Sequence, residues 1–292
     1  MPRPGRTPLP QLLRLLDLER LDRDLFLGDP GPGEYRLFGG LVAAQAVISA
    51  YRTVDEGAMH SLHAYFLRPG KHGVPIRYAV YRIRDGRTFT TRDVVAYQSG
   101  EAIFNLSCSF AKPEEGISHA GPMPDVPGPE KLPPWEFARA ETDAEREMMA
   151  RFERDSAVEL RSIDAVQPPA PDDIPRRRVW MRVRGVLPED PAVHAALLAY
   201  ASDRGLIATA RIPHQRGRGP RPGNWASASL DHALWFHRPP RFDDWVLFTS
   251  ESPVAHAARA LIFGQMYRRD GTRIASVVQE GLIRTPRAAA PM

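Results

Sequence analysis

The stretches SLHAYFLRP (residues 61–69) and SLDHALWFHRP (residues 229–239) resemble each other and occur one in each half of the chain. Both begin with Ser-Leu, and both end in an aromatic residue followed by Phe, any residue, Arg and Pro. Each copy then continues with an arginine ahead of an apolar run and with a glycine turn, at Arg92 and Gly100 in the first copy and at Arg259 and Gly271 in the second. This repeat predicts two copies of one structural unit.

The surroundings of the two stretches have the same organisation. In each copy, short runs of alternating apolar and polar residues are bounded by Gly, Pro and Asp, which predicts antiparallel strands. One Ala-rich helix precedes each set of strands, over residues 38–54 and 190–202. A meander of strands around one long helix is the hotdog architecture. We therefore expect an α+β double hotdog, with two tandem helix-wrapped antiparallel sheets joined in one chain. Because exposed sheet edges invite aggregation, the two sheets are expected to join edge to edge.

The same features predict the domain boundaries. Residues 1–112 are expected to form an N-terminal hotdog domain, and residues 179–292 a C-terminal hotdog domain that carries the catalytic residues. The segment between them, 113–178, is rich in proline and charge, and its only clear helical pattern is ETDAEREMMARFERDS (141–156). We interpret this segment as a linker with a surface helix.

Composition narrows the choice of partner and compartment. The net charge of +4 is carried almost wholly by arginine, with acidic residues interleaved throughout, so we expect no nucleic-acid partner. The one cysteine, Cys108, excludes a disulfide framework and a multi-cysteine metal site, and we expect it to be a small buried hydrophobe. No apolar run reaches the length of a signal peptide or a membrane span. A cytoplasmic protein without stable membrane insertion is expected.

Several catalytic motifs are missing, including the G-x-S-x-G nucleophile elbow, both glycine-rich phosphate loops and the H-E-x-x-H zinc motif. Instead, three polar residues stand where the pattern favours other types. Asp203 ends the second helix, where the helix dipole disfavours a carboxylate. Ser229 starts the second sheet, and Gln279 interrupts an apolar strand in which an unbonded amide would be costly. Counted from the two glycine turns, the first copy has Cys108 in place of Gln279, so only the second half is expected to hold a working site.

A carboxylate, a hydroxyl and an amide together can hold and polarise a water molecule. The carboxylate accepts a proton from the water, the hydroxyl fixes the orientation, and the amide holds the water or donates to a developing oxyanion. This set of groups suits hydrolysis of an activated acyl group.

Five segments occur in a fixed order: FGGLVAAQA (38–46), HSLHAYFLRPG (60–70), LAYASD (198–203), SLDHALWFHRP (229–239) and ASVVQEG (275–281). Together they resemble the acyl-CoA thioesterase II family, which includes bacterial thioesterase II and peroxisomal acyl-CoA thioesterases. The resemblance implies a double hotdog that hydrolyses fatty acyl-CoA to free fatty acid and CoA. It implies that Asp203, Ser229 and Gln279 orient the hydrolytic water, that no cofactor is needed besides the CoA of the substrate, and that the chain forms a homo-oligomer, a dimer or a tetramer.

The segment between Asp203 and Ser229 departs most from the family, because it is rich in Arg and Gly and carries Arg211, Arg216, Arg218 and Arg221. We hypothesise that Arg216 and Arg218 help to hold the CoA phosphates, the alternative being a solvated loop. The acyl chain is expected in an apolar tunnel between helix and sheet of the second half. Its candidate walls are Leu198, Trp235, Phe236 and Leu261. Gly39 and Gly40 permit close approach of the backbone to the ligand or to the facing sheet, and we favour packing.

Two other functions stay open at this stage. One is an acyl-CoA sensor or carrier that keeps the fold and turns over little. The other is a hotdog enoyl-CoA hydratase, for which Asp231 and His237 would supply the acid and base. The segment around Asp231 lacks the Gly and Asn typical of those hydratases, which disfavours this reading.

Overall fold

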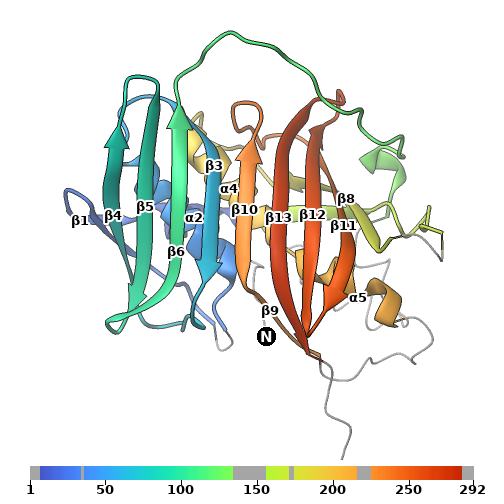
Figure 1. Cartoon of the computed structure of the whole chain (residues 1–292), viewed down its shortest axis with the longest axis horizontal. Helices are drawn as coiled ribbons and strands as arrows, with labels where there is room; N and C mark the ends of the chain where they lie inside the picture. Colours follow the sequence, from blue (N-terminus) through green and yellow to red (C-terminus); the bar gives the residue numbers. More distant parts are fainter. Residues whose placement is uncertain (1–6, 34–35, 134–155, 171–173, 216–224, 285–292) are drawn as a thin grey trace, which may run out of the picture.

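A computed structural model describes residues 7–33, 36–133, 156–170, 174–215 and 225–284. Within these residues, one continuous antiparallel sheet of thirteen strands runs through both halves, in the order β1-β2-β4-β5-β6-β3-β10-β13-β12-β11-β8-β7, with β9 paired to β13 (Figure 1). Helices α2 and α4 lie behind the middle of this sheet in that view. The predicted double hotdog with joined sheets is therefore confirmed.

The first half begins with a short amphipathic helix and two short strands, and its central helix precedes four longer strands. Its elements are α1 (Leu9–Leu16), β1 (Glu19–Asp22), β2 (Leu25–Gly28), α2 (Gly39–Tyr51), β3 (Ala58–Phe66), β4 (Ile76–Asp85), β5 (Phe89–Gln98) and β6 (Glu101–Ala111). A 3-10 turn, η1 (Pro129–Lys131), follows.

The second half repeats this plan around its own central helix. Its elements are β7 (Val158–Ser162), β8 (Arg176–Val183), α4 (Pro191–Ser202), α5 (Leu206–Gln215), β9 (Ala226–Ser229), β10 (Asp231–Phe236), β11 (Val246–His256), β12 (Arg259–Arg268) and β13 (Arg273–Arg284).

The two repeated sequence stretches form the seam between the halves. The first lies on β3 and the second on β10, and these strands pair antiparallel, with Asp231 opposite Tyr65 and Trp235 opposite Ser61. Side chains on a strand alternate between the two faces of the sheet. His232, Leu234 and Phe236 are therefore buried on the helix side of the seam, together with their neighbours on β3.

The central helices are buried on nearly every side, which explains their small residues. Helix α4 begins with Pro191 and is capped by Asp190, whose carboxylate accepts a hydrogen bond from the Ala192 N–H at 2.9 Å. Helix α2 packs against α4 at Gly40, where an added Cβ would lie 2.7 Å from the Tyr200 carbonyl oxygen. No side chain caps the N-terminus of α2. The expectation of close packing at Gly40 is confirmed.

The expected linker, residues 113–178, proves to contain part of the second sheet. Strand β7 and the first residues of β8 lie inside it, so the boundary predicted at residue 179 falls within a strand and is wrong for the sheet. Residues 123–132 of this segment lie on the face of the sheet opposite the helices, where the Trp180 indole N–H donates to the Pro127 carbonyl oxygen at 2.9 Å. Leu247, Tyr267 and Met123 pack there in a second apolar cluster. The predicted helix over 141–156 lies almost wholly outside the described residues.

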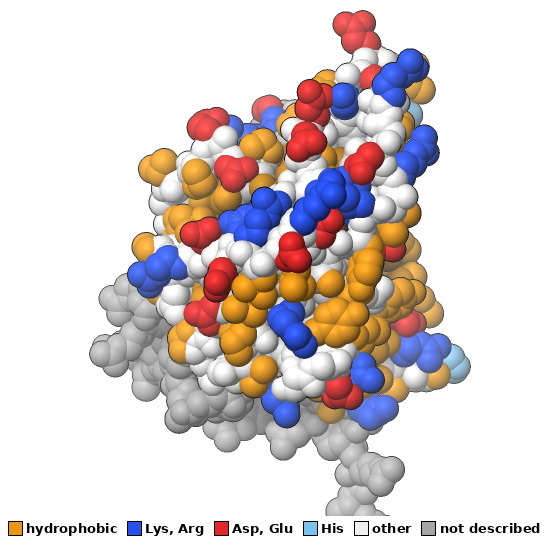
Figure 2. Space-filling view, turned by 90° about the vertical axis from the view of Figure 1, so that its left-hand side faces the viewer, with side chains coloured by type: hydrophobic (Ala, Val, Ile, Leu, Met, Phe, Trp, Pro, Cys, Tyr) orange, Lys and Arg blue, Asp and Glu red, His pale blue; other side chains and the backbone are white. Residues whose placement is uncertain are grey.

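Charges of both signs are interleaved on the side of the molecule that Figure 2 shows, as the sequence predicts. No described helix is long and apolar enough to span a membrane.

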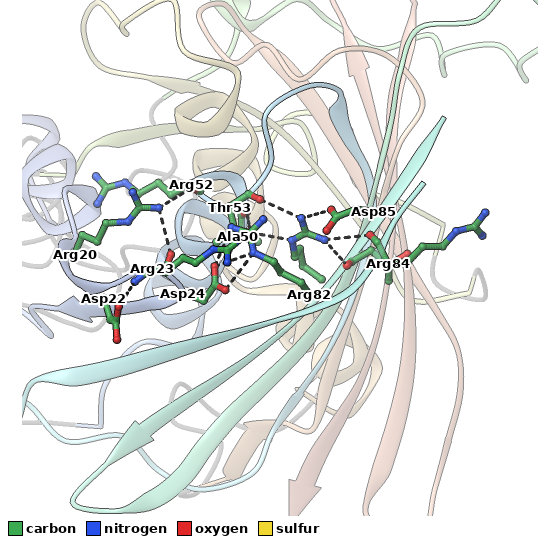
Figure 3. A network of polar contacts seen from close by, with 12 residues as sticks. Arg20, Asp22, Arg23, Asp24, Ala50, Arg52, Thr53, Arg82, Arg84 and Asp85 are labelled. Atoms are coloured by element: carbon green, nitrogen blue, oxygen red, sulfur yellow. Dashed lines mark hydrogen bonds and ion pairs between the residues drawn. The ribbon is translucent and has the colours of Figure 1, made fainter. Parts of the chain in front are cut away.

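A buried arginine, Arg92, fills the space below the C-terminal end of α2. Its guanidinium donates to the Thr53 hydroxyl and carbonyl oxygens, both at 3.0 Å, and pairs with Asp85. It also donates to the Arg84 carbonyl oxygen at 3.1 Å (Figure 3). Cys108, directly opposite Arg92 on the neighbouring strand, is buried, as expected from the sequence.

Candidate active site

Three elements bring Asp203, Ser229 and Gln279 together. Asp203 is the residue at the C-terminal end of α4, Ser229 is the last residue of β9, and Gln279 lies in β13. The Ser229 hydroxyl donates to Asp203 Oδ1 at 3.0 Å, and the Gln279 side-chain amide donates to the same oxygen at 2.8 Å. The proximity predicted from the sequence is therefore present in the structure.

These two donors account for a carboxylate at the unfavourable end of a helix. The C-terminal end of α4 carries partial negative charge, which repels the carboxylate of Asp203. Hydrogen bonds to an ionised acceptor are stronger than those between neutral groups, so the Ser229 and Gln279 donors offset part of that repulsion. Both bind Oδ1, and Oδ2 faces the first turn of α2, where a Cβ added to Gly39 would lie 3.1 Å away.

A β-bulge aims Ser229 at Asp203. Ser229 lies opposite Gly281, whereas Ala233 lies opposite Val278, so four steps along one strand match three along the other. The extra residue lies between β9 and β10, at or next to Leu230. Strict alternation from the buried His232 and Leu234 would turn Ser229 to the opposite face of the sheet. Because the bulge adds one residue, the Ser229 side chain instead points to the helix side of the sheet.

A cavity of about 450 Å³ opens onto Asp203 and Ser229 and lies between the two halves. The first half lines it with the residues around the start of α2 and the ends of β3 and β6: Arg36, Leu37, Phe38, Gly39, Val42, Phe66, Leu67, Arg68, Pro69, Gly70, Ile103 and Phe104. The second half contributes Asp203, Gly205, Ile207, Ala208, Arg211, Ser227, Ala228, Ser229 and Leu230. Most of this lining is apolar, so the cavity suits a hydrophobic substrate with a reacting group at Asp203.

The predicted walls of the acyl tunnel do not line this cavity. Leu198 is fully buried in α4, and Phe236 of β10 is buried on the helix side of the sheet. Trp235 lies on the opposite face of the sheet, where its ring packs edge-on against His63 with centroids 5.0 Å apart. Leu261 is on β12, away from the lining residues. These four residues lie apart from the cavity because it is between the halves and not between the helix and sheet of one half.

Gly39, for which the sequence interpretation favoured packing over approach to a ligand, lies beside the candidate site. An added Cβ there would lie 2.6 Å from the Phe66 ring as well as close to Asp203. Gly39 lines the cavity, so the missing side chain serves both the packing and the space beside the carboxylate. The signal that could have found it is the FGG segment itself, one of those that carry the family resemblance.

The predicted arginines divide into two groups. Arg216 and Arg218 lie outside the described residues. Arg211, on α5, lines the cavity.

A second polar group lies directly behind the site. His232 is buried, and its Nε2 lies 2.8 Å from the Ser202 hydroxyl, which itself donates to the Ala199 carbonyl oxygen at 3.0 Å. Since the Ser202 hydrogen is used, Nε2 is the protonated nitrogen of His232. Burial lowers the pKa of His232 and favours the neutral ring. This pair fixes the residue next to Asp203 at the end of α4.

The acid and base that a hydratase would need are not assembled. Asp231 accepts a hydrogen bond from the Glu280 backbone N–H at 2.6 Å, and burial raises its pKa. His237 binds the Ser276 hydroxyl at 2.7 Å. Neither lines the cavity, and Asp231 acts as a support for β13. In the described part of the chain, no three His, Cys, Asp or Glu side chains form a set of metal ligands.

Comparisons with known proteins place this chain in a family of acyl-CoA thioesterases. Two family models match the chain, "Acyl-CoA thioesterase N-terminal domain" over residues 28–111 and "Acyl-CoA thioesterase" over residues 149–282. Acyl-coenzyme A thioesterase 8 of Mus musculus is 39% identical over 285 residues, which cover 92% of this chain and 88% of that protein. Acyl-CoA thioesterase 2 of Haemophilus influenzae is 35% identical, with 94% and 98% covered.

The crystal structure of an acyl-CoA thioesterase II from Mycobacterium marinum superimposes with a TM-score of 0.80 at 38% identity, covering 96% of this chain and all of that one. The chain therefore belongs to the acyl-CoA thioesterase II family, and by class it is an acyl-CoA thioesterase.

Proposed function

We propose that the chain hydrolyses fatty acyl-CoA by direct attack of a water molecule held at Asp203, Ser229 and Gln279. The observation that carries this proposal is the geometry of one carboxylate. Asp203 Oδ1 receives both hydrogen bonds from Ser229 and Gln279, which fixes the group and leaves Oδ2 beside Gly39 at the cavity. A fixed carboxylate with one uncommitted oxygen at a substrate cavity suits a general base.

In this mechanism Asp203 Oδ2 takes a proton from the water as its oxygen bonds to the thioester carbon. The carbonyl oxygen becomes an oxyanion, and the C–S bond then breaks. The CoA thiolate takes the proton back from Asp203, and free acid and CoA leave. No covalent bond to the chain is formed at any step.

The start of α2 supports the developing oxyanion. Phe38 and Gly39 line the cavity, and no described side chain caps this helix. The first N–H groups of a helix lack partners within it, and its N-terminal end carries partial positive charge. Donors of this kind, held in place before the reaction, typically contribute about 10²–10³-fold to the rate. The acyl chain is placed in the apolar part of the cavity, against Val42, Phe66 and Ile103.

The test is release of free CoA thiol from acyl-CoAs of increasing length, from acetyl-CoA to stearoyl-CoA. Asp203→Asn is expected to lower kcat about 10²–10⁴-fold, because the general base is lost. Ser229→Ala is expected to lower it about 10–100-fold, because one charge-assisted hydrogen bond to Asp203 is lost. Ser276→Ala, on the opposite face of β13, is the matched control and is expected to keep full activity.

Each alternative has its own outcome. Binding of acyl-CoA without thiol release would point to a sensor or carrier. Unchanged release by Asp203→Asn would contradict the assignment of the water site, even with the activity present.

A further inference from the structure

Three arginines line the active-site cavity, and they outnumber its carboxylates. Arg36 comes from the segment before α2, Arg68 from the end of β3, and Arg211 from α5. Asp203 is the one acidic side chain among the described lining residues. Arg68 lies 3.6 Å from Glu101, so its charge is partly balanced, whereas no carboxylate lies within ion-pair distance of Arg36 or Arg211 among the described residues.

Arg211 is the member of this set with the least solvent around it. Its Nε is enclosed and has no hydrogen-bond partner among the described residues, and burial lowers the pKa of its guanidinium. Two other partly buried arginines have carboxylate partners, Arg82 with Asp24 at 3.0 Å and Arg178 with Asp164 at 2.9 Å. A partly desolvated cation without a counter-ion costs free energy, which a bound anion would offset.

The position of Arg211 along α5 fixes where that anion would be. Arg211 follows Ala208 by three residues and Ile207 by four, so it lies on the same side of the helix as both, and all three line the cavity. The first of these residues, Ile207, lies four residues after Asp203, where the thioester is proposed to react. Arg211 places a positive charge one turn further along the helix. An anion held by Arg211 is therefore separate from the reacting carbonyl.

We infer that Arg211, together with Arg36, binds the phosphate groups of the CoA part of the substrate while the thioester lies at Asp203. This inference rests on the proposed function. The acyl chain and the pantetheine arm of an acyl-CoA carry no charge, so its anionic groups are the diphosphate and the 3′-phosphate. A guanidinium matches phosphate oxygens with two parallel N–H donors.

The experiment combines one variant with substrates that lose phosphates in steps. Arg211→Met keeps much of the side-chain volume and the helix propensity while removing the charge. One acyl chain is presented on CoA, on 3′-dephospho-CoA and on pantetheine. The variant is expected to lower kcat/KM for the acyl-CoA about 10–100-fold, mainly through KM, and to leave the acyl-pantetheine unaffected.

The truncated substrates identify the phosphate. If Arg211 contacts the 3′-phosphate, the effect of the variant disappears with the 3′-dephospho-CoA thioester. If it contacts the diphosphate, the effect persists with that thioester and disappears only with the acyl-pantetheine. Both outcomes support the inference. An equal loss on acyl-pantetheine, or no loss on any substrate, would overturn it.

Two further variants control the result. Arg77→Met removes an equal charge from the exposed side of β4, away from the cavity, and is expected to change nothing. Arg36→Met is expected to act in the same direction as Arg211→Met, with a smaller effect because Arg36 is exposed. Hydrolysis of acyl-pantetheine reports on the reaction itself. Its dependence on Asp203 tests the proposed function, and its independence of Arg211 tests this inference.

Discussion

The two central helices of this molecule end in opposite ways. At the C-terminal end of α2 stands Arg52, which donates to the Leu18 carbonyl oxygen and to Asp17 Oδ1, the latter at 2.8 Å. At the corresponding end of α4 stands Asp203. A cation stabilises a helix at this end and an anion destabilises it, so the first repeat has the residue that favours folding and the second has the one that opposes it.

The side chains that pack against the two helix ends also differ between the halves. In the second half, Gln279 donates to Asp203, and its strand neighbour is the apolar Ile262. In the first half, Cys108 stands at the matching position of the repeat, and its strand neighbour Arg92 fills the space and binds the residues after α2. In the first half, Arg92 therefore holds the end of α2 in place. In the second half, Gln279 supports a carboxylate beside a cavity at some cost in stability, as is common for active sites.

The largest expected effect comes from substituting the residue at this position in each half, Gln279 or Cys108. Gln279→Leu removes one donor to Asp203 at similar volume, and we expect kcat for acyl-CoA hydrolysis to fall about 10²-fold or more. The free energy of unfolding should change little, because the lost bond to Asp203 is offset by removal of the buried Gln279 Oε1 atom, which has no partner among the described residues. Cys108→Ala should leave kcat unchanged and cost about 1 kcal/mol.

Thiol release and urea unfolding of the two variants measure this difference between the halves. Equal losses of activity from both substitutions would mean that the two halves share the catalytic work.

The next effect is on stability and concerns the first half. Arg92 is 1% exposed and makes four hydrogen bonds besides its bond to Asp85, so Arg92→Met leaves several buried acceptors unpaired. We expect a loss of about 3 kcal/mol in the free energy of unfolding, with unchanged kcat per folded molecule. Arg82→Met, which breaks the more exposed pair with Asp24, should cost about 1 kcal/mol or less. A similar cost for both would show that Arg92 is not the group that holds α2.

The same comparison explains what could be predicted from the sequence. The repeat was visible because both halves keep the strand that forms the seam, and the pairing of β3 with β10 confirms the joined sheets. Asp203 and Gln279 were visible because each is a polar residue in a place that favours another type. Ser229 was visible as a hydroxyl at the start of the second sheet, and the resemblance to a family then grouped the three residues around one water.

Other features depend on contacts that no single stretch of sequence encodes. Most of the cavity lining comes from the first half of the chain. A prediction confined to the helix and sheet of the second half therefore chose Leu198 and Phe236, which are buried elsewhere. The bulge between β9 and β10 breaks the alternation on which a strand prediction relies. Strand β7 was missed because its five residues lie within a Pro-rich, charged segment.

A smaller effect is expected at two hairpin turns, one in each half. The turn between β5 and β6 has Ser99 and Gly100 with φ of 51° and 83°, and the turn between β11 and β12 has Ala257 and Ala258 with φ of 49° and 61°. Positive φ strains alanine and suits Asn and Gly, which are the preferred residues of such turns.

The double substitution Ala257→Asn with Ala258→Gly should therefore add about 1 kcal/mol of stability. Gly100→Ala should remove about 1 kcal/mol, although a Cβ there meets nothing within 4 Å. Thermal unfolding measures both changes. A loss in the first case would show that the alanines are held by something other than the turn.

The smallest expected effect returns to the two helix ends. Asp203→Asn removes a negative charge from the end of α4 and keeps an oxygen that can accept from Ser229 and Gln279, so the free energy of unfolding should rise by about 0.5 kcal/mol while hydrolysis is lost. Arg52→Gln removes a favourable charge from the end of α2, so stability should fall by about 0.5 kcal/mol while hydrolysis is kept. Urea unfolding at low salt resolves the two signs, and added salt should shrink both shifts because it screens the charges. A loss of stability in Asp203→Asn would mean that the carboxylate holds the end of α4 in place, and its position would then owe more to folding than to the reaction.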